Sequence, residues 1–209
     1  MPRKSKILSI VPDRKNTFKI TTSLGIGFSV PEEVLLEMSL IEGDDLSDSD
    51  IILLKSSTDY FKVRNTALTL LDYRMRSKKE LEFKLLKKGY NKNTVYKVIE
   101  DLEDKGWVDD EKFCLAFGRD QINRNSIGPI ALKYKLIKHI DSLSLIEEIS
   151  DKIYSELNIE NIIMNVLVKC PPEKLKKEEN LKRKIINRLK RKGHYWQDIN
   201  GALNKYLNS

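Results

Sequence analysis

The residues of this chain best suited to chemistry are a run of cations near its end. Seven of the eleven residues from 182 to 192 are basic and none is acidic: Lys182, Arg183, Lys184, Arg188, Lys190, Arg191 and Lys192. With no acid available for i,i+4 pairs, these cations repel one another on a helix. The run suits nucleic-acid phosphates or an acidic protein surface, and phosphate contacts would be salt-dependent and blind to sequence. The plainer interpretation is a solvated helix face.

Two smaller groups extend this set of candidates. Tyr195 and Trp196 follow the cationic run directly, and aromatic rings beside cations are candidates for stacking on bases. A second cationic group occurs earlier in the chain, with acidic residues within reach: Lys84, Lys87 and Lys88. We expect this group to be the weaker of the two contact candidates.

Asp109, Asp110 and Glu111 invite a metal or acid–base interpretation. No histidine or second carboxylate pair completes such a site, so we expect Asp109 to cap a helix that starts at Asp110. The chain has no phosphate-binding loop, dinucleotide glycine pattern or nucleophile–base pair. Cys114 and Cys170 lack metal-ligand spacing and suit small buried residues in a reducing compartment. We therefore expect no enzyme activity, no metal and no other cofactor.

The net charge of +7 is concentrated at one end of the chain. Residues 1–64 carry a net charge of −1, residues 65–164 a net charge of 0, and residues 165–209 a net charge of +8. Apolar residues make up 40% and charged residues 33%, which suits helices with thin cores. No apolar run reaches about 18 residues and the start lacks a signal-peptide pattern. These features predict a cytoplasmic protein with no membrane contact.

The elements that would position these residues begin with a helix–turn–helix from Ser77 to Trp107. Ser77 and Glu80 form a capping box, apolar residues then recur at helical spacing, and lysines precede Gly89 at the turn. Asn91 or Asn93 caps the next helix, and Gly106 ends it. We expect Trp107 to pack between helical units.

The same unit recurs at an offset of 104 residues. Its core positions and its turn glycine align without a gap: Leu81 with Ile185, Leu85 with Leu189, Gly89 with Gly193, Val95 with Ile199, Val98 with Ala202, and Ile99 with Leu203. A weaker middle copy spans residues 113–154, with His139 and Ile140 where the turn glycine would stand. Repeated units with matching cores predict neighbouring copies packed in series.

The N-terminal part differs from the rest. Apolar residues that alternate with polar ones over residues 6–30 predict two strands joined by a turn, with a third short strand near residues 25–30. A short helix opens at Pro31, and Ser47, Asp48 or Ser49 caps another helix over Ile51–Lys55. A further amphipathic helix is predicted over Asn65–Arg76. Residues 1–64 contain nothing that we can assign to chemistry, whereas the Asn65–Arg76 helix forms a three-helix unit with the helix–turn–helix described above.

These motifs resemble the RecX family, bacterial modulators of the RecA recombinase. The resemblance covers residues 65–205. It rests on residues that occur in family order and spacing: Ala67, Leu71, Arg74, Ser77, Glu80, Leu81, Leu85, Gly89, Gly106, Trp107, Val108, Asp109, Asp110, Phe113, Arg119, Gly128 and Pro129. The middle copy departs from the family at His139–Ile140, where a Lys–Gly turn is usual.

The resemblance implies a non-enzymatic regulator built from three-helix units. Family members bind RecA along the groove of its filament on single-stranded DNA and damp ATP hydrolysis and strand exchange, which would regulate recombinational DNA repair. We therefore expect RecA and its filament as partners, free DNA as a further partner, and a monomer. The alternative is a generic nucleic-acid-binding helical-repeat protein with no recombinase partner.

The expected fold is mainly α, with three tandem three-helix repeats in an elongated arrangement after a small β-containing module. The predicted boundaries are 1–64 for the N-terminal β/α module and 65–209 for the helical region. Within that region the repeats are expected at 65–107, 108–155 and 156–209.

Overall fold

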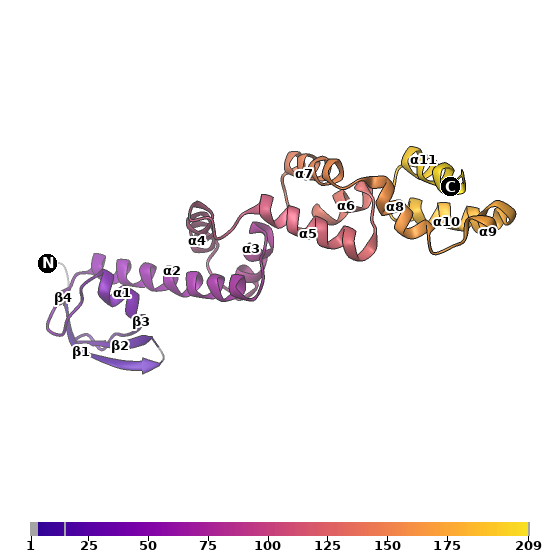
Figure 1. Ribbon diagram of the computed structural model, residues 1–209. Coiled ribbons are helices and arrows are strands. Elements are labelled where there is room, and N and C mark those ends of the chain that lie inside the picture. Colours follow the sequence, from indigo (N-terminus) through magenta and orange to yellow (C-terminus); the bar gives the residue numbers. More distant parts are fainter. Residues whose placement is uncertain (1–3, 15, 209) are drawn as a thin grey trace. The chain divides into compact units, whose positions relative to one another are not determined.

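The computed structural model describes residues 4–14 and 16–208 (Figure 1). It comprises two compact units. The first contains residues up to 74 together with 81–107, and the second contains residues 75–80 together with those from 108 onward. Each unit has buried apolar residues of its own. Within the part of the chain described, no helix is long and apolar enough to cross a membrane.

The first unit begins with an antiparallel sheet of four strands. Its strands are β1 (Ser5–Arg14), β2 (Thr17–Thr22), β3 (Gly27–Pro31) and β4 (Asp45–Leu46), in the order β3-β2-β1-β4. Ile10 pairs with Ile20, which in turn pairs with Phe28. The three predicted strands are confirmed. The two-residue β4, which pairs with Ser5 and Lys6, is too short to leave a sequence pattern.

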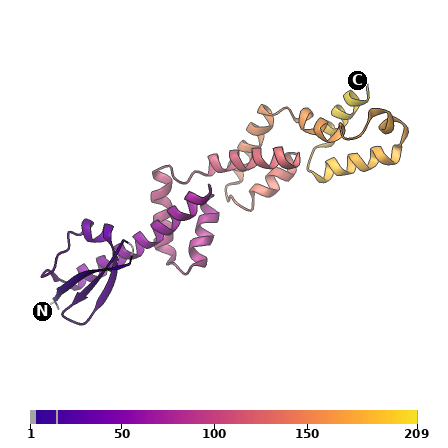
Figure 2. The same cartoon turned by 60° about the horizontal axis from the view of Figure 1, so that its bottom comes forward.

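Two helices complete the core of this sheet. α1 (Glu32–Glu37) and α2 (Asp48–Tyr73) both contact β3 and each other. Figure 2 shows the sheet and these helices from a second direction. Ile20 and Val30 each follow an exposed residue in their strands and are fully buried in one cluster with Val34 and Leu54. Successive side chains of a strand point to opposite faces of the sheet, which explains why Ile20 and Val30 point into the core while the residues before them point to solvent.

α2 corrects the predicted helix boundaries. The sequence predicted separate helices over Ile51–Lys55 and Asn65–Arg76, whereas the structure has one continuous helix. Ser47 is the cap among the three candidates, since its Oγ accepts from Asp50 N at 3.2 Å and Asp50 Oδ2 accepts from Ser47 N at 2.8 Å. No Gly or Pro occurs between Asp48 and Tyr73, so nothing breaks the helix. The predicted boundary between residues 64 and 65 lies inside it.

The helix–turn–helix of the first unit matches its prediction. It consists of α3 (Lys78–Lys87), whose residues 78–80 belong to the second unit, and α4 (Lys92–Asp104). Asn91 Oδ1 accepts from the amides of Asn93 and Thr94, so Asn91 rather than Asn93 is the cap. Gly89 and Gly106 adopt φ values of +87° and +71° at the two helix ends, which is the conformation that glycine allows.

α4 is tied to α2 by a hydrogen bond between side chains. Tyr60 donates its hydroxyl to Asp101 Oδ2 at 2.6 Å, and Lys97 Nζ lies 5.5 Å from the Tyr60 ring centroid. Burial, followed by the hydrogen bond to Asp101, raises the pKa of Tyr60 to about 12. The phenol therefore stays protonated and acts as a donor across the neutral pH range.

The second unit contains two helical cores. The first is formed by α5 (Asp110–Asn125), α6 (Pro129–Leu136) and α7 (Leu143–Glu156). Phe113, Leu132, Leu136, Ile149 and Ile153 are among its buried residues. A Cβ on Gly118 would lie 2.6 Å from Ile153 Cδ1, so the Ile153 side chain would have to shift to admit it. This glycine therefore lets α5 and α7 approach closely.

The second core belongs to α8 (Ile159–Leu167), α9 (Pro172–Lys177), α10 (Glu179–Arg191) and α11 (Trp196–Asn208). Ile163, Leu175, Leu189, Ile199 and Leu203 are buried in it. The chain breaks between α8 and Pro172, and the short helix α9 follows the break. Pro172 occupies its first turn, where a missing amide is tolerated.

Positions 104 residues apart have the same structural roles. Leu85 and Leu189 are both fully buried, and Gly89 and Gly193 have φ values of +87° and +84°. The sequence alignment therefore identified equivalent core and turn positions. The division of residues 65–209 into three repeats stays a prediction.

The turn of the middle copy is built without glycine. His139 N and Ile140 N both donate to Leu136 O, and Ile140 is buried. His139 Nδ1 lies 2.9 Å from Glu80 Oε1, and its ring lies 4.9 Å from that of Phe117. Ser77 Oγ accepts from Glu80 N at 3.2 Å, so this half of the predicted capping box is present while the Glu80 carboxylate contacts His139.

Candidate polyanion-binding surface

The cationic run lies on α10 and leaves five side chains exposed. We define the α10 basic face as Arg183, Lys184, Arg188, Lys190 and Arg191. Within residues 4–14 and 16–208, none of these five forms an ion pair. Their charges are therefore available to a partner rather than neutralised within the chain.

The amphipathic pattern of α10 explains this orientation. Leu189 is fully buried, and Leu181 and Ile185 are half-buried on the same side of the helix. Burying that side leaves the cations on the solvent side. Lys184, Arg188 and Arg191 follow i, i+4 and i+7 spacing, so they form one stripe. A shallow recess of about 510 Å³ is lined by Lys184, Asn187, Lys190 and Arg191.

Two members of the predicted cationic set are placed differently. Lys182 and Lys192 are half-buried, and Lys192 Nζ donates to the backbone oxygen of Asn125. Burial, followed by the nearby cations Arg188 and Lys169, lowers the pKa of Lys192. Lys192 therefore acts as a structural donor to the C-terminal end of α5 and is not part of the α10 basic face.

Lys192 is part of a junction that joins α10 to the start of α6. Gly128 N donates to Lys192 O at 2.8 Å, and Ile130 N donates to Gly193 O at 3.1 Å. A Cβ on Gly128 would overlap the Gly193 carbonyl oxygen and lie 2.5 Å from His194 N. The two glycines therefore allow direct backbone contact between segments about 65 residues apart.

His194 lies buried within this junction. The residue is 2% exposed, and its Nε2 lies 2.9 Å from Ser126 O, an acceptor, so Nε2 carries the proton. Nδ1 is buried and has no hydrogen-bond partner among the described residues. Burial is the main cause of the lowered pKa of His194, opposed by the Ser126 hydrogen bond and by Asp198 and reinforced by Lys192. The imidazole is therefore neutral at pH 7.

We expect acid to weaken the second unit through His194. Its pKa in the folded chain lies below the ordinary 6.5, so between the two values the unfolded chain binds more protons. The contribution is fully present above about pH 6.5 and decreases as pH falls, by at most about 1.4 kcal/mol per pH unit. His194→Gln keeps an amide donor for Ser126 O and should flatten this part of the profile. Urea unfolding at pH values on both sides of 6.5 tests this, and parallel profiles for both proteins would contradict it.

The aromatic candidates lie beside the α10 basic face. Tyr195 is 46% exposed and Trp196 50% exposed. Lys190 Nζ lies 4.8 Å from the Trp196 ring centroid, within the range of a cation–π contact. Lys190 therefore occupies one face of the indole ring, which leaves Tyr195 as the less encumbered candidate for stacking.

The weaker cationic group lies in the first unit. Lys87 and Lys88 are exposed and Lys84 is half-buried. None of the three forms an ion pair within the described residues, although Glu80 and Glu82 were expected to compete for them. This group thus remains a candidate contact in its own right.

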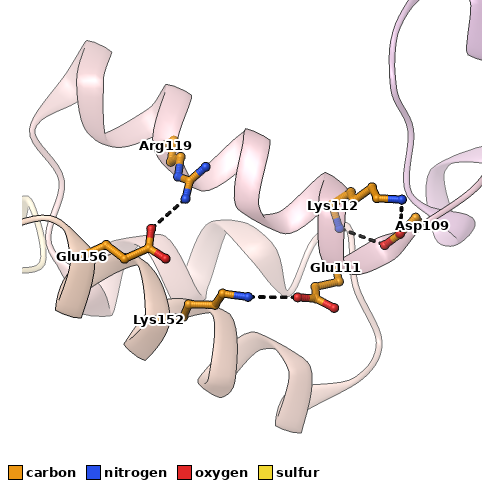
Figure 3. A network of polar contacts seen from close by, with 6 residues as sticks. All are labelled: Asp109, Glu111, Lys112, Arg119, Lys152 and Glu156. Carbon is orange, nitrogen blue, oxygen red and sulfur yellow. Dashed lines mark hydrogen bonds and ion pairs between the residues drawn. The ribbon is translucent and has the colours of Figure 1, made fainter.

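The acidic run has structural partners for all three residues. Asp109 Oδ1 accepts from Lys112 N at 2.9 Å, which is the main reason that its pKa is lowered. Asp110 Oδ1 accepts from Lys78 N at 2.8 Å. Glu111 pairs with Lys152 at 3.2 Å, alongside Arg119 with Glu156, between α5 and α7 (Figure 3). These roles are those of a helix cap and of ion pairs, and no metal-binding group of three or more ligands occurs among the residues described.

The packing predicted for the Trp107 side chain is wrong. The sequence predicted a side chain wedged between helical units, whereas Trp107 is 63% exposed. Its amide donates to Leu102 O at 2.8 Å, which closes the end of α4, and the next residue, Val108, is buried instead. The geometry of the helix end therefore places Val108, and not Trp107, in a buried position.

Known proteins are similar to this chain over the residues that carry these motifs. The family described as "RecX, first three-helix domain" matches residues 64–102. "Regulatory protein RecX" of Bacillus subtilis is 32% identical over 207 residues, which cover 95% of this chain and 76% of that protein. This chain belongs to the RecX regulatory protein family. The RecX protein of Oceanobacillus iheyensis is 35% identical over 128 residues, a match that spans 60% of this chain and 47% of that protein.

Solved structures show the same fold. A crystal structure of regulatory protein RecX aligns with 96% of this chain and 99% of its own length, with a TM-score of 0.76 and 20% identity. RecX from Lactobacillus salivarius covers 73% of this chain with a TM-score of 0.65. The predicted fold class, mainly helical with a small N-terminal β-containing module, is confirmed. Membership of the RecX family implies regulation of RecA, and the relatives are named regulatory proteins with no catalytic family indicated.

Two features of this surface were missed in the sequence. The contact between Gly128 and Gly193 has no local signal, because the two residues are far apart in the chain. An exposed apolar stripe on α6 (Ile130, Tyr134 and Ile137) had a visible signal, namely i, i+4 and i+7 spacing opposite the core positions Leu132 and Leu136. A helix with two apolar faces was thus detectable before the structure.

Proposed function

We propose that this RecX family member inhibits RecA by binding along the groove of the RecA filament on single-stranded DNA. The observation that carries the proposal is the α10 basic face, five exposed cations that form no ion pair within the described residues, in a chain of this family. Unpaired cations repel one another, so neutralisation by phosphates or by acidic RecA side chains would lower their free energy.

The mechanism we infer is steric and allosteric. A chain seated in the groove competes with entry of a duplex, which would slow strand exchange. The same contacts bias RecA subunits away from the interface that hydrolyses ATP, because a ligand shifts an equilibrium toward the state that it binds more tightly. The consequence would be regulation of recombinational DNA repair in the cytoplasm.

The remaining contacts follow from the predicted division into repeats. We propose repeats at 65–107, 108–155 and 156–209, with the N-terminal module ahead of them. Lys84, Lys87 and Lys88 would give the first repeat a contact of its own, and Lys182, Tyr195 and Trp196 would extend the α10 basic face. Successive repeats on a monomer could then follow a helical groove.

The experiment that tests this proposal is the ATPase activity of RecA on single-stranded DNA during titration with this chain. We expect substoichiometric amounts to suppress turnover. Unchanged turnover, together with tight salt-sensitive binding to naked DNA, would favour the alternative of a generic nucleic-acid-binding protein.

A further inference from the structure

α6 is apolar on two opposite sides. Leu132 and Leu136 are fully buried in the core with α5 and α7. On the other side, Ile130, Tyr134 and Ile137 are 48%, 73% and 45% exposed. Their i, i+4 and i+7 spacing makes them neighbours on one helix surface, which we call the α6 stripe.

The α6 stripe is unusual for a helix at a protein surface. Single exposed apolar residues are common, but a surface helix normally carries polar residues opposite its core side. Here three large side chains occupy that position in a continuous row. An apolar row left in water suggests a surface that is covered by a partner.

The residue types in the stripe favour a protein partner over a nucleic acid. A tyrosine ring can stack on a base, but the aliphatic side chains of Ile130 and Ile137 offer no stacking face. Aliphatic side chains gain free energy mainly by burial against other apolar groups. By contrast, the exposed side chains of the α10 basic face are all cationic, and such a surface is suited to phosphates.

Charges around the stripe indicate the chemistry of that partner. Residues 129–140 contain three lysines and no acidic residue. Lys133 is already paired with Glu147 and Asp151 on α7. Lys135 and Lys138 have no ion pair among the described residues, and Lys138 follows Tyr134 by four positions. The stripe thus has a basic margin that complements acidic side chains.

We propose that the α6 stripe docks on a RecA surface that has an apolar centre and an acidic rim. This inference rests on the proposed function and adds a division of labour to it. The α6 stripe binds protein and the α10 basic face binds the polyanion. Backbone hydrogen bonds from Gly128 to Lys192 and from Ile130 to Gly193 hold the two elements side by side, so both engage one filament together.

The test is a variant carrying Tyr134→Ser and Ile137→Ser, compared with a control carrying Leu36→Ser and Ile52→Ser. The control removes two exposed apolar side chains, 72% and 68% exposed, from the first unit. Binding to RecA–single-stranded DNA filaments, made with a slowly hydrolysed ATP analogue, is measured beside binding to naked single-stranded DNA. We expect the stripe variant to lose about tenfold or more in filament affinity, since buried aromatic anchors dominate protein interfaces. Its affinity for naked DNA should match wild type, as should both affinities of the control.

Each of the remaining outcomes would contradict a different claim. Filament binding by the stripe variant equal to wild type overturns the docking surface and leaves the proposed function standing. Wild type that binds the filament no better than naked DNA overturns the proposed function and the docking surface with it. A wild-type dimer in sedimentation that the stripe variant loses assigns the stripe to a second copy and overturns the RecA assignment. Circular dichroism checks folding, and Tyr134→Ser alone replaces the double variant if that variant unfolds.

Discussion

Gly193→Ala is expected to destabilise the second unit by about 3 kcal/mol or more, combining backbone strain with overpacking. Gly193 has φ +84°, a conformation that favours glycine. A Cβ at this position would overlap the amide nitrogen of Ala131 and lie 2.6 Å from its Cβ. The obstructing atoms belong to the backbone and the Cβ of α6, so no rotamer change relieves the overlap. The substitution must therefore separate α10 from α6.

Gly89→Ala is the matched control for this substitution. Gly89 is the equivalent residue 104 positions earlier, with φ +87°, and a Cβ there would have nothing within 4 Å. It carries the same backbone strain without the overlap, so we expect a loss of only about 1 kcal/mol. The difference between the two variants isolates the contact with Ala131.

Urea unfolding followed by circular dichroism measures both effects. We expect the transition of the second unit to move to clearly lower urea in Gly193→Ala, and the transition of the first unit, which contains Gly89, to move only slightly in Gly89→Ala. Equal shifts in the two variants would contradict the close approach of Gly193 to α6.

Removing three cations from the α10 basic face is expected to weaken binding to single-stranded DNA by about a hundredfold at 0.1 M salt. The variant replaces Lys184, Arg188 and Arg191 by alanine. Each lost phosphate contact reduces the slope of log affinity against log salt by about 0.7, so three contacts reduce it by about 2. The side chains are exposed and form no ion pair within the described residues, so the fold should be retained.

A charge-matched control separates a local surface from a general effect of charge. Lys19, Lys62 and Lys105 are exposed, and replacing them by alanine removes the same three charges from the first unit. We expect this control to change the salt slope little. Fluorescence anisotropy over a salt series measures both variants, and equal losses would show that total charge, and not the α10 basic face, determines binding.

Much of the helical architecture follows from local signals in the sequence. Asn91 and Asp109 cap the helices that their positions predicted, and Gly89 and Gly193 take the conformations expected of turn glycines. Caps and turns depend on a few adjacent residues, so the pattern carries the information. The cations of α10 were identified for the same reason, since their solvent side follows from the buried Leu189 and the half-buried Leu181 and Ile185.

The errors arise where structure depends on distant contacts or on missing breaks. Separate helices were predicted over Ile51–Lys55 and Asn65–Arg76, whereas the residues between them continue one helix and include no Gly or Pro. Trp107 was assigned to packing because it is an aromatic residue directly after a helix stop, whereas its side chain is exposed. The junction around His194 and the placement of Lys192 depend on segments more than 60 residues apart. No local pattern reports such contacts.

The most direct test of the central claim is the RecA ATPase on single-stranded DNA, measured with substoichiometric amounts of this chain. Wild type, the Lys184, Arg188 and Arg191 variant and the charge-matched control would be titrated under one salt condition. We predict that wild type and the control suppress turnover to the same extent and that the basic-face variant does not. Turnover that stays unchanged with wild type would contradict the account, even if the chain binds naked DNA tightly.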